Sequence, residues 1–536
     1  MTPMTVTFDL LITNATVIDG TGAPRFLADV AVTGERIAEV RRVTAAGPVP
    51  DRPTAERVID ASGLVLSPGF IDLHSHADFS IQGHPQATTQ LMQGVTTALT
   101  GNCGSTPFPT RDLELIRQEN AHLSPDFDGD WTDAAGFHRA LTGVSPGINI
   151  ATQVGFSSIR AHIVGLENRA PSPAELAAMQ DEIRRAADQG VRGFSSGLIY
   201  TPGSYCTPAE IAALARTAAE CGLLYSTHIR NESFTMIEAV DEAIRAAEDS
   251  GVRLEISHLK AMGPENWGAP ARALERIDAA RARGLDVAAD VYPYTASSTR
   301  LTSRLPDFAM DGGKDELLRL LASPGDRARV AQGLAARFGR DVDPDGIVIA
   351  ELAPAGAEDL SWTIGHSLTE IGERLGTDPA EAAMRVLAGH DASVAIVNHA
   401  MHPDDVAAVL QHPWVSVASD GWTMQPRGAG KPHPRSFGTF ARVLGHYVRE
   451  QGVLSLEEAV RKMTGLPAER LRLADRGRVA AGWIADLSLF DPATVTDRST
   501  FDDPWQLATG VRAVFLGGRA AVLDGALTGV RAGRVL

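Results

Sequence analysis

Short hydrophobic runs alternate with longer helical stretches over most of the chain, from about residue 70 to about residue 420. Runs such as 95–99 and 254–257 have the length of buried strands. The stretches 172–189 and 235–249 have the length and composition of helices. A regular alternation of strand and helix is typical of a parallel (β/α)8 barrel of the TIM type, so an α/β fold is predicted for the centre of the chain.

Ten segments qualify as strands of this barrel, which has places for eight. The region 307–351 has the composition of a helical insertion, and it is expected to take up one or two of the surplus segments. The ten candidates are 71–73, 95–99, 148–154, 193–196, 223–226, 254–257, 287–289, 347–350, 394–397 and 414–418.

Both ends of the chain are rich in short strands separated by glycine turns. Two β-rich ends of this kind can share one sandwich beside a central domain. We therefore expect a small β-sandwich built from residues 1–66 and 476–536. Residues 67–475 are expected to form the catalytic barrel, with the insertion at about 307–351.

Composition and charge narrow the class of protein. The 536 residues are 44% hydrophobic and 21% charged, as in ordinary globular proteins, and the net charge of −17 disfavours nonspecific binding to nucleic acid or to an anionic membrane. Three cysteines fit a reducing compartment and cannot form a disulfide framework. Without a signal-like N-terminus or a run of 18 apolar residues, a cytoplasmic protein with a small-molecule partner is expected. The sequence indicates no oligomeric state.

Two histidines mark the end of the first candidate barrel strand, in the sequence LSPGFIDLHSH. Side chains alternate along a strand, so His74 and His76 point to the same side. In a (β/α)8 barrel the active site forms at the carboxyl ends of the strands. A single strand histidine is usually a core residue, whereas two at this spacing predict a metal site.

Four more candidate residues follow hydrophobic runs. Cys103 lies in a glycine-flanked turn, where a thiolate is a good ligand for Zn²⁺, although a cysteine taken alone is more often a small buried apolar residue. His228 and His258 end successive strand and helix units and would reach the same mouth of the barrel. Asp420 closes the last candidate strand, where a carboxylate can bind a metal or act as a general base, or can simply cap a turn.

Taken together, these motifs resemble the N-acyl-D-amino-acid deacylases, or D-aminoacylases, of the amidohydrolase superfamily. The resemblance covers essentially the whole chain and rests on the motifs SPGFIDLHSHAD, GNCG, GFSSGLIYTPG, THIRNE, SHLK, DVYPY, SDG and HPRSFGTFARVLG. It implies a zinc-dependent (β/α)8 barrel flanked by a small β-sandwich built from both chain ends.

The resemblance also implies the roles of the candidate residues. Cys103, His228 and His258 match the ligands of a tightly held zinc ion. His74 and His76 match those of a second, more weakly occupied site, and Asp420 matches the catalytic acid and base. Many dinuclear amidohydrolases bridge their metals with a lysine or glutamate on the fourth strand, which VRGFSSGLIY does not contain. Cys103 would then be the anionic ligand that replaces it.

The expected reaction is hydrolysis of the amide bond of an N-acyl-D-amino acid to a carboxylate and a free D-amino acid. Lys260, Tyr200, Tyr292 and Arg435 are the expected partners of the substrate, with a structural role as a loop anchor equally open for Arg435. Selectivity for the D isomer rests on the resemblance alone. The acyl group and the side-chain preference stay open, since Arg435 or Arg427 could supply a cation for an acidic side chain.

Several other residues and segments have expected local roles or roles that stay open. Asp290 is expected to cap a turn, and His162 to have a local role. Cys206 and Cys221 have no partner at metal-like spacing, and a contact of His399 with substrate is left open. The segments 421–434 and 307–351 are candidate lids over the mouth.

Two alternative functions stay open. Hydantoinases and dihydroorotases share the barrel and the paired histidines but cleave cyclic amides, usually with the bridging lysine that this chain lacks. In a different class, a barrel of this type can lose its ligands and serve as a structural or assembly protein, which the complete ligand set argues against. Activity on a hydantoin tests the first alternative, and metal content tests the second.

Overall fold

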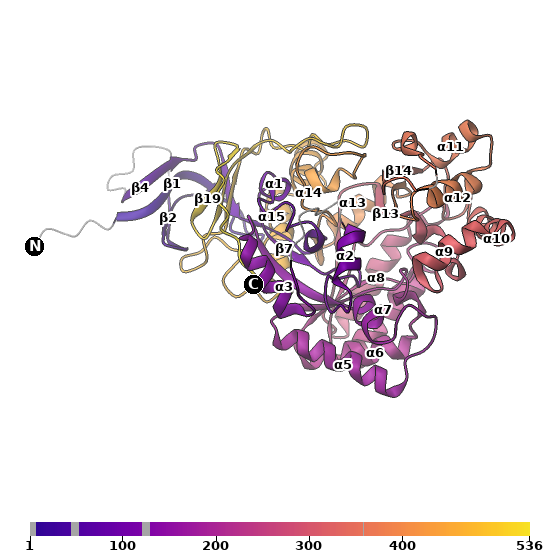
Figure 1. The fold of residues 1–536 in the computed structure, drawn as a ribbon. Helices are drawn as coiled ribbons and strands as arrows, with labels where there is room; N and C mark the ends of the chain where they lie inside the picture. Colours follow the sequence, from indigo (N-terminus) through magenta and orange to yellow (C-terminus); the bar gives the residue numbers. More distant parts are fainter. Residues whose placement is uncertain (1–6, 44–52, 121–128, 357) are drawn as a thin grey trace, which may run out of the picture.

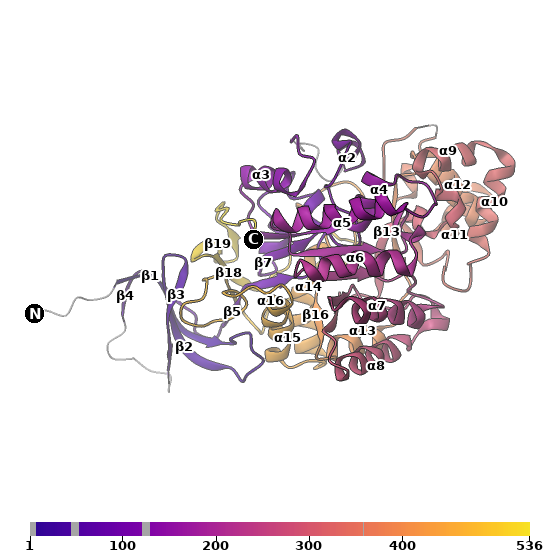
Figure 2. The same ribbon diagram turned by 90° about the horizontal axis from the view of Figure 1, so that it is seen from below.

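A computed structural model describes residues 7–43, 53–120, 129–356 and 358–536. The chain forms three parts that follow one another along the long axis of the molecule (Figure 1). A β-rich part that holds the N-terminal strands lies at one end, a barrel occupies the centre, and a helical module lies at the other end. The same order is seen from below (Figure 2).

The central barrel contains eight parallel strands in a nearly closed ring. It is closed where the first strand meets the last, since the amide N of Asp420 donates to the carbonyl O of His74 at 2.8 Å. The predicted (β/α)8 barrel is confirmed. In chain order the strands are β6 (Phe70–Asp72), β7 (Val95–Thr100), β8 (Asn149–Gly155), β9 (Gly193–Gly197), β10 (Leu224–His228), β11 (Arg253–Ile256), β12 (Val287–Val291) and β16 (Val415–Val417).

Helices cover the outside of the barrel, and several lie side by side in Figure 2. Residues next to the helix ends favour helix formation, as the helix that begins at Pro173 shows. The hydroxyl of Ser172 caps this helix by accepting a hydrogen bond from the amide of Glu175, and the proline occupies its first position. The helices around the barrel are α1 (Thr88–Leu91), α2 (Leu113–Asn120), α3 (Ala134–Val144), α4 (Phe156–Ile163), α5 (Pro173–Asp188), α6 (Pro208–Glu220), α7 (Met236–Ser250), α8 (Ala269–Ala282), α13 (Pro403–Gln411), α14 (Arg435–Arg442), α15 (Leu456–Met463) and α16 (Gly465–Arg470).

Two of the ten candidate strands lie outside the barrel. The segments predicted at 347–350 and 394–397 become β14 (Ile347–Leu352) and β15 (Val394–His399), which pair with β13 (Ala296–Arg300) in a separate antiparallel sheet. This sheet shares a hydrophobic core with four helices. Buried strands of the barrel and of the separate sheet are both short apolar runs, so the local sequence pattern does not show to which of the two sheets a strand belongs. The helices are α9 (Gly313–Ala322), α10 (Pro324–Ala335), α11 (Leu368–Leu375) and α12 (Pro379–Gly389).

The two ends of the chain form one nine-stranded mixed sheet with its own core. They are joined where β5 runs antiparallel to β17, with Leu66 opposite Leu489. The strands are β1 (Thr7–Val17), β2 (Phe26–Thr33), β3 (Arg36–Arg42), β4 (Thr54–Asp60), β5 (Val65–Pro68), β17 (Leu487–Phe490), β18 (Val511–Leu516), β19 (Arg519–Leu523) and β20 (Ala526–Leu527).

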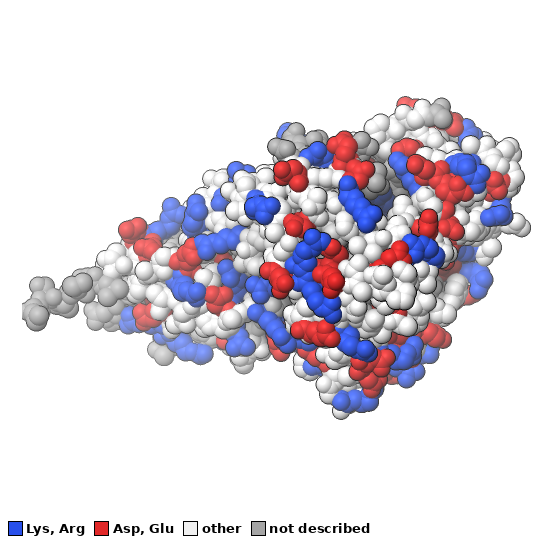
Figure 3. Space-filling model, turned by 60° about the horizontal axis from the view of Figure 1, so that its bottom comes forward, with Lys and Arg blue, Asp and Glu red and all other residues white. Residues whose placement is uncertain are grey.

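The surface view in Figure 3 shows acidic and basic side chains interspersed, without a continuous basic patch on that face. In the part of the chain that the structure describes, every helix falls short of the length and hydrophobicity needed to cross a membrane.

Candidate metal centre

The thiol of Cys103 lies at the centre of three imidazoles at the mouth of the barrel. Its Sγ is 3.4 Å from Nε2 of His74, 3.5 Å from Nε2 of His258 and 3.7 Å from Nδ1 of His228. The four side chains come from the ends of β6, β7, β10 and β11, and all four residues are buried. The barrel therefore brings together residues that are up to 184 positions apart, as the difference between 258 and 74 shows.

This donor set fits a zinc ion. With Zn–S near 2.3 Å and Zn–N near 2.0–2.1 Å, sulfur and nitrogen ligands of a tetrahedral site lie about 3.5 Å apart. The three measured distances from the Cys103 sulfur bracket that value. One thiolate and neutral imidazoles also have the chemical character that Zn²⁺ prefers.

A second group of possible ligands adjoins the first and shares His74 with it. The Oδ1 atom of Asp420 is 3.0 Å from Nε2 of His76 and 3.4 Å from Nε2 of His74. His74, His76 and Asp420 thus form a second cluster of potential ligands. The sequence prediction that His74 and His76 face the same site agrees with this arrangement.

Three residues of the centre adopt a left-handed backbone conformation. The φ angles are 54° at Cys103, 36° at His258 and 51° at Asp420. Such angles are uncommon outside glycine and store strain of about 1–3 kcal/mol each. Each lies just beyond a barrel strand, where the backbone turns out of the sheet, so the strain accompanies the turn that aims these side chains at one point.

The electric field of the centre stabilises anions. Burial alone would favour the neutral thiol, but His74 and His258 hold the pKa of Cys103 well below its usual range. Burial also opposes ionisation of Asp420, yet Arg435 and His74 hold the pKa of that carboxyl well below its usual range. Both groups are therefore ionised at neutral pH, as a metal ligand and a general base must be.

Two buried carboxylates, Asp290 and Glu232, contact the imidazoles, a role that the sequence did not indicate for either. Asp290 was expected to cap the turn after its strand, and this prediction was wrong. Its Oδ1 accepts a hydrogen bond from the amide N of His258 at 2.8 Å and lies 3.3 Å from Nδ1 of His74. Glu232 reaches both remaining histidines, 3.2 Å from Nδ1 of His258 and 3.4 Å from Nε2 of His228. Such carboxylates orient metal-binding imidazoles and fix their tautomers.

Glu232 also holds the ammonium group of Lys260, at 2.5 Å from its Nζ. Lys260 lies beside the site, since the same Nζ is 2.9 Å from Nδ1 of His258. The lysine is buried, and its charge is already balanced by the Glu232 carboxylate. The sequence placed Lys260 at the mouth but gave no sign of this pairing.

The other three predicted substrate partners also lie at the mouth. Arg435 places Nη1 2.7 Å from Oδ2 of Asp420, and its guanidinium lies 5.1 Å from the ring centre of Tyr292. The ring of Tyr200 lies 4.9 Å from that of His228. Tyr292 is buried, and its hydroxyl finds no hydrogen-bond partner among the described residues.

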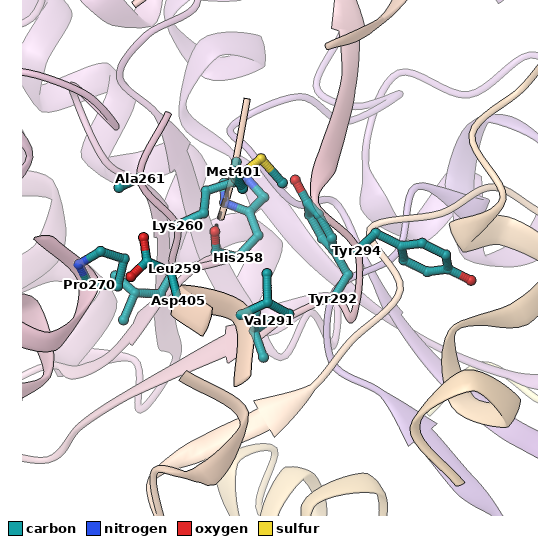
Figure 4. Close-up of a pocket in the computed structure, with 11 residues that line it drawn as sticks. His258, Leu259, Lys260, Ala261, Pro270, Val291, Tyr292, Tyr294, Met401 and Asp405 are labelled. Carbon is teal, nitrogen blue, oxygen red and sulfur yellow. Dashed lines mark hydrogen bonds between the residues drawn. The ribbon is translucent and has the colours of Figure 1, made fainter. Parts of the chain in front are cut away.

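The cavity behind His258 is too small to hold a substrate. Its volume is about 10 Å³, enough for a single water, and His258, Lys260, Tyr292 and Met401 help to line it. Figure 4 shows His258, Lys260 and Met401 close together, with Tyr294 turned away from them.

Other residues considered from the sequence lie apart from the centre. His399 ends β15 in the separate sheet, where its exposed ring lies 4.6 Å from that of Phe501. His162 belongs to α4, and Arg427 is exposed. Cys206 contacts the guanidinium of Arg230 at 3.5 Å.

Comparisons with known proteins agree with this geometry. The amidohydrolase family model matches residues 57–146 and 347–522. The chain is 37% identical to an N-acyl-D-glutamate deacylase and 36% identical to a D-aminoacylase, both of Alcaligenes xylosoxydans xylosoxydans. These matches cover 98% and 99% of this chain and 96% and 97% of the relatives.

A solved structure is similar over the same extent. It is an N-acyl-D-glutamate deacylase from Bordetella bronchiseptica, crystallised with zinc and a phosphonate inhibitor that mimics the tetrahedral intermediate of the reaction. The TM-score is 0.81 at 35% identity, and the match covers 99% of this chain and 100% of the other.

Proposed function

This chain belongs to the N-acyl-D-amino-acid deacylases of the amidohydrolase family, and from that premise we propose that it hydrolyses the amide bond of N-acyl-D-amino acids. The products are a carboxylate and a free D-amino acid. The observation that carries the proposal is the Cys103 sulfur, 3.4–3.7 Å from three imidazole nitrogens, beside an ionised Asp420.

Cys103, His228 and His258 are the proposed ligands of a tightly held zinc ion. His74 and His76 are the proposed ligands of a weaker second site, which would share the Cys103 thiolate because His74 also lies beside that sulfur. The chemistry that zinc supplies when bound is polarisation of the amide carbonyl and a lower pKa for water.

Asp420 is the proposed general base and acid. It accepts a proton from the attacking water and returns that proton to the departing amine. Its low pKa keeps the carboxylate ionised before reaction. The same low pKa makes the protonated form a strong acid, which favours release of the proton to the amine.

Arg435 and Tyr292 are the proposed anchors of the substrate α-carboxylate. The guanidinium stands over the Tyr292 ring, and the Tyr292 hydroxyl has no hydrogen-bond partner among the described residues. Lys260 and Tyr200 complete this set, with Lys260 held in place by Glu232. A bidentate arginine is well suited to hold a planar carboxylate.

All of these residues lie within 67–475, the proposed catalytic part of the chain. Residues 1–66 and 476–536, the proposed β-sandwich, contribute none of them. Within the barrel, β9 is the fourth strand and contains neither lysine nor glutamate, which supports Cys103 as the anionic ligand.

The test is metal content followed by amine release from N-acetyl-D-methionine, N-acetyl-L-methionine and a hydantoin after addition of Zn²⁺. Release from the D isomer alone, with about one tightly held zinc per chain, is the expected result. Cleavage of the hydantoin alone would replace the proposal with cyclic-amide hydrolysis. A protein that retains no zinc would contradict a metal-dependent reaction.

A further inference from the structure

His433 is a buried histidine whose two ring nitrogens are both bonded to the backbone. Only 3% of its surface is exposed. Nδ1 accepts a hydrogen bond from the amide N of Arg435 at 3.0 Å, and Nε2 donates to the carbonyl O of Ala296 at 2.9 Å. Because an amide N–H donates and a carbonyl accepts, the two bonds together fix the neutral ring with its proton on Nε2.

The surroundings of this imidazole also favour the neutral form and one orientation. Burial, with the Arg435 cation in the same sense, holds the pKa of His433 well below its usual range. The rings of Tyr294 and Phe501 stand edge-on to the imidazole, with centres 5.2 Å and 5.0 Å away. The imidazole is therefore an uncharged link, packed on two sides, between two segments of backbone.

The first of its two bonds caps the start of α14. The first amides of a helix have no acceptor within the helix, and Pro434, which precedes α14, offers no side-chain acceptor. The imidazole of His433 supplies one instead. The amide that it holds belongs to Arg435, whose guanidinium lies 2.7 Å from the Asp420 carboxylate.

The second bond ties the same part of the chain to β13 in the separate sheet. Ala296 is the first residue of β13. Two residues further along that strand, the carbonyl O of Ser298 accepts from Nη2 of Arg435 at 3.3 Å. The imidazole and the guanidinium thus hold two positions of one strand, and these contacts set the direction from which the guanidinium reaches Asp420.

We propose that His433 is a positioning residue of the deacylase reaction, which holds the Arg435 guanidinium in place between Asp420 and the substrate carboxylate. Misplacing such a group by about 1 Å can cost about 10²-fold in rate. His433 acts through Arg435 and not on the reacting atoms. The inference therefore rests on the proposed function, in which Arg435 is an anchor.

The test starts from His433→Leu, which removes both bonds and keeps a buried apolar side chain. For the N-acyl-D-amino acid that the wild type cleaves best, kcat/KM should fall by about 10- to 100-fold, with part of the loss in KM. The acidic limb of the kcat/KM profile should move to higher pH, because Arg435 holds down the pKa of Asp420 less effectively. The tightly held zinc should stay at its wild-type level.

Two conservative variants separate the two bonds. His433→Asn places an amide oxygen near the position of Nδ1, where it can accept from the amide two residues further on. His433→Gln places its amide N–H near the position of Nε2, where it can donate to Ala296. Both should recover part of kcat/KM, and His433→Asn should recover more, because the cap acts directly on the backbone of Arg435.

His390→Leu is the matched control. His390 is 1% exposed and makes the same two kinds of bond at the end of α12 in the helical module. Its Nε2 accepts from the amide N of Leu360 at 3.0 Å, and its Nδ1 lies 2.7 Å from the carbonyl O of Ala353. Both leucine variants should melt at a lower temperature than the wild type, but His390→Leu should leave the pH profile unchanged.

A double-mutant cycle tests whether His433 acts through Arg435. In an Arg435→Met background, His433→Leu should change kcat/KM by less than about twofold, since the guanidinium that it positions is gone. An equal loss in both backgrounds would overturn the positioning role, and so would an acidic limb that stays in place in His433→Leu.

Either of these results would leave the deacylase proposal intact. If His433→Leu does not fold, His433→Gln takes its place in the cycle and in the pH profile, because it keeps the bond to Ala296. A wild-type protein that cleaves no N-acyl-D-amino acid would refute the proposed function itself.

Discussion

The guanidinium of Arg435 and the carboxylate of Asp420 form a buried ion pair at the mouth of the barrel, with Nη1 2.7 Å from Oδ2. Arg435 is the strongest of the groups that lower the pKa of Asp420 against the effect of burial. One arginine thereby links the two halves of the proposed site, the anchor of the substrate and the group that moves the proton.

Replacing Arg435 with Met should therefore change two measurable properties. Loss of a carboxylate anchor is expected to raise KM by about 10- to 100-fold. Loss of the cation raises the pKa of Asp420, so the acidic limb of the kcat/KM profile should move to higher pH. A pH–rate profile measures both effects. An unchanged acidic limb would show that Arg435 does not set the ionisation of Asp420.

Asp420→Ala should separate proton transfer from metal binding. We expect kcat to fall by at least about 10²-fold while the tightly held zinc stays near its wild-type level, because the ligands grouped around Cys103 remain. Asp278→Ala is the control, because the side chain of Asp278 is 58% exposed. If the Asp420→Ala variant lost the tightly held zinc, Asp420 would be a zinc ligand and not only a proton acceptor.

Cys103→Ala should remove the tightly held zinc and nearly all activity. The thiolate is the anion that the three imidazoles surround, so no other side chain takes its place. Cys206→Ala serves as the control, since that buried cysteine lies against Arg230. Metal analysis after dialysis measures the difference. Zinc retained at the wild-type level in Cys103→Ala would refute the ligand assignment.

Glu232→Gln should weaken zinc binding without removing a ligand. This carboxylate touches His228, His258 and Lys260, and loss of such an outer contact typically costs about 10- to 100-fold in metal affinity. Competition with a chelator measures the affinity. Glu210→Gln is a matched control, because Glu210 is also buried and ion-paired, with Arg160 at 2.7 Å. Equal affinities of the two variants would argue against a positioning role.

The two candidate lids, segments 421–434 and 307–351, should both become more protected from hydrogen exchange when a substrate analogue binds. The amide N of Lys431, in segment 421–434, donates to the carbonyl O of Ala350, in segment 307–351, at 2.8 Å. Hydrogen exchange with and without a phosphonate analogue of the substrate would measure this gain. If neither segment slowed its exchange, both would be fixed walls of the site and the lid hypothesis would be abandoned.

Local pattern was sufficient to single out the residues that the structure brings together at the mouth of the barrel. His74 and His76, two positions apart just beyond the end of β6, lie in one cluster as the sequence predicted, and the strand ends located Cys103, His258 and Asp420. Pattern was not sufficient for the partners of these residues. Asp290 looked like a turn cap because the carboxylate meets His74 only after the ring of strands has closed.

The sequence by itself determined the order of strands and helices, the types of side chain at the mouth of the barrel and the family, since these depend on residues close together in the chain. The tertiary structure decided which eight of ten strands form the barrel. It also decided that Glu232 balances Lys260 and that Asp290 meets His74. Burial and charge balance depend on residues tens to hundreds of positions apart, and only the folded chain brings those residues within a few ångströms.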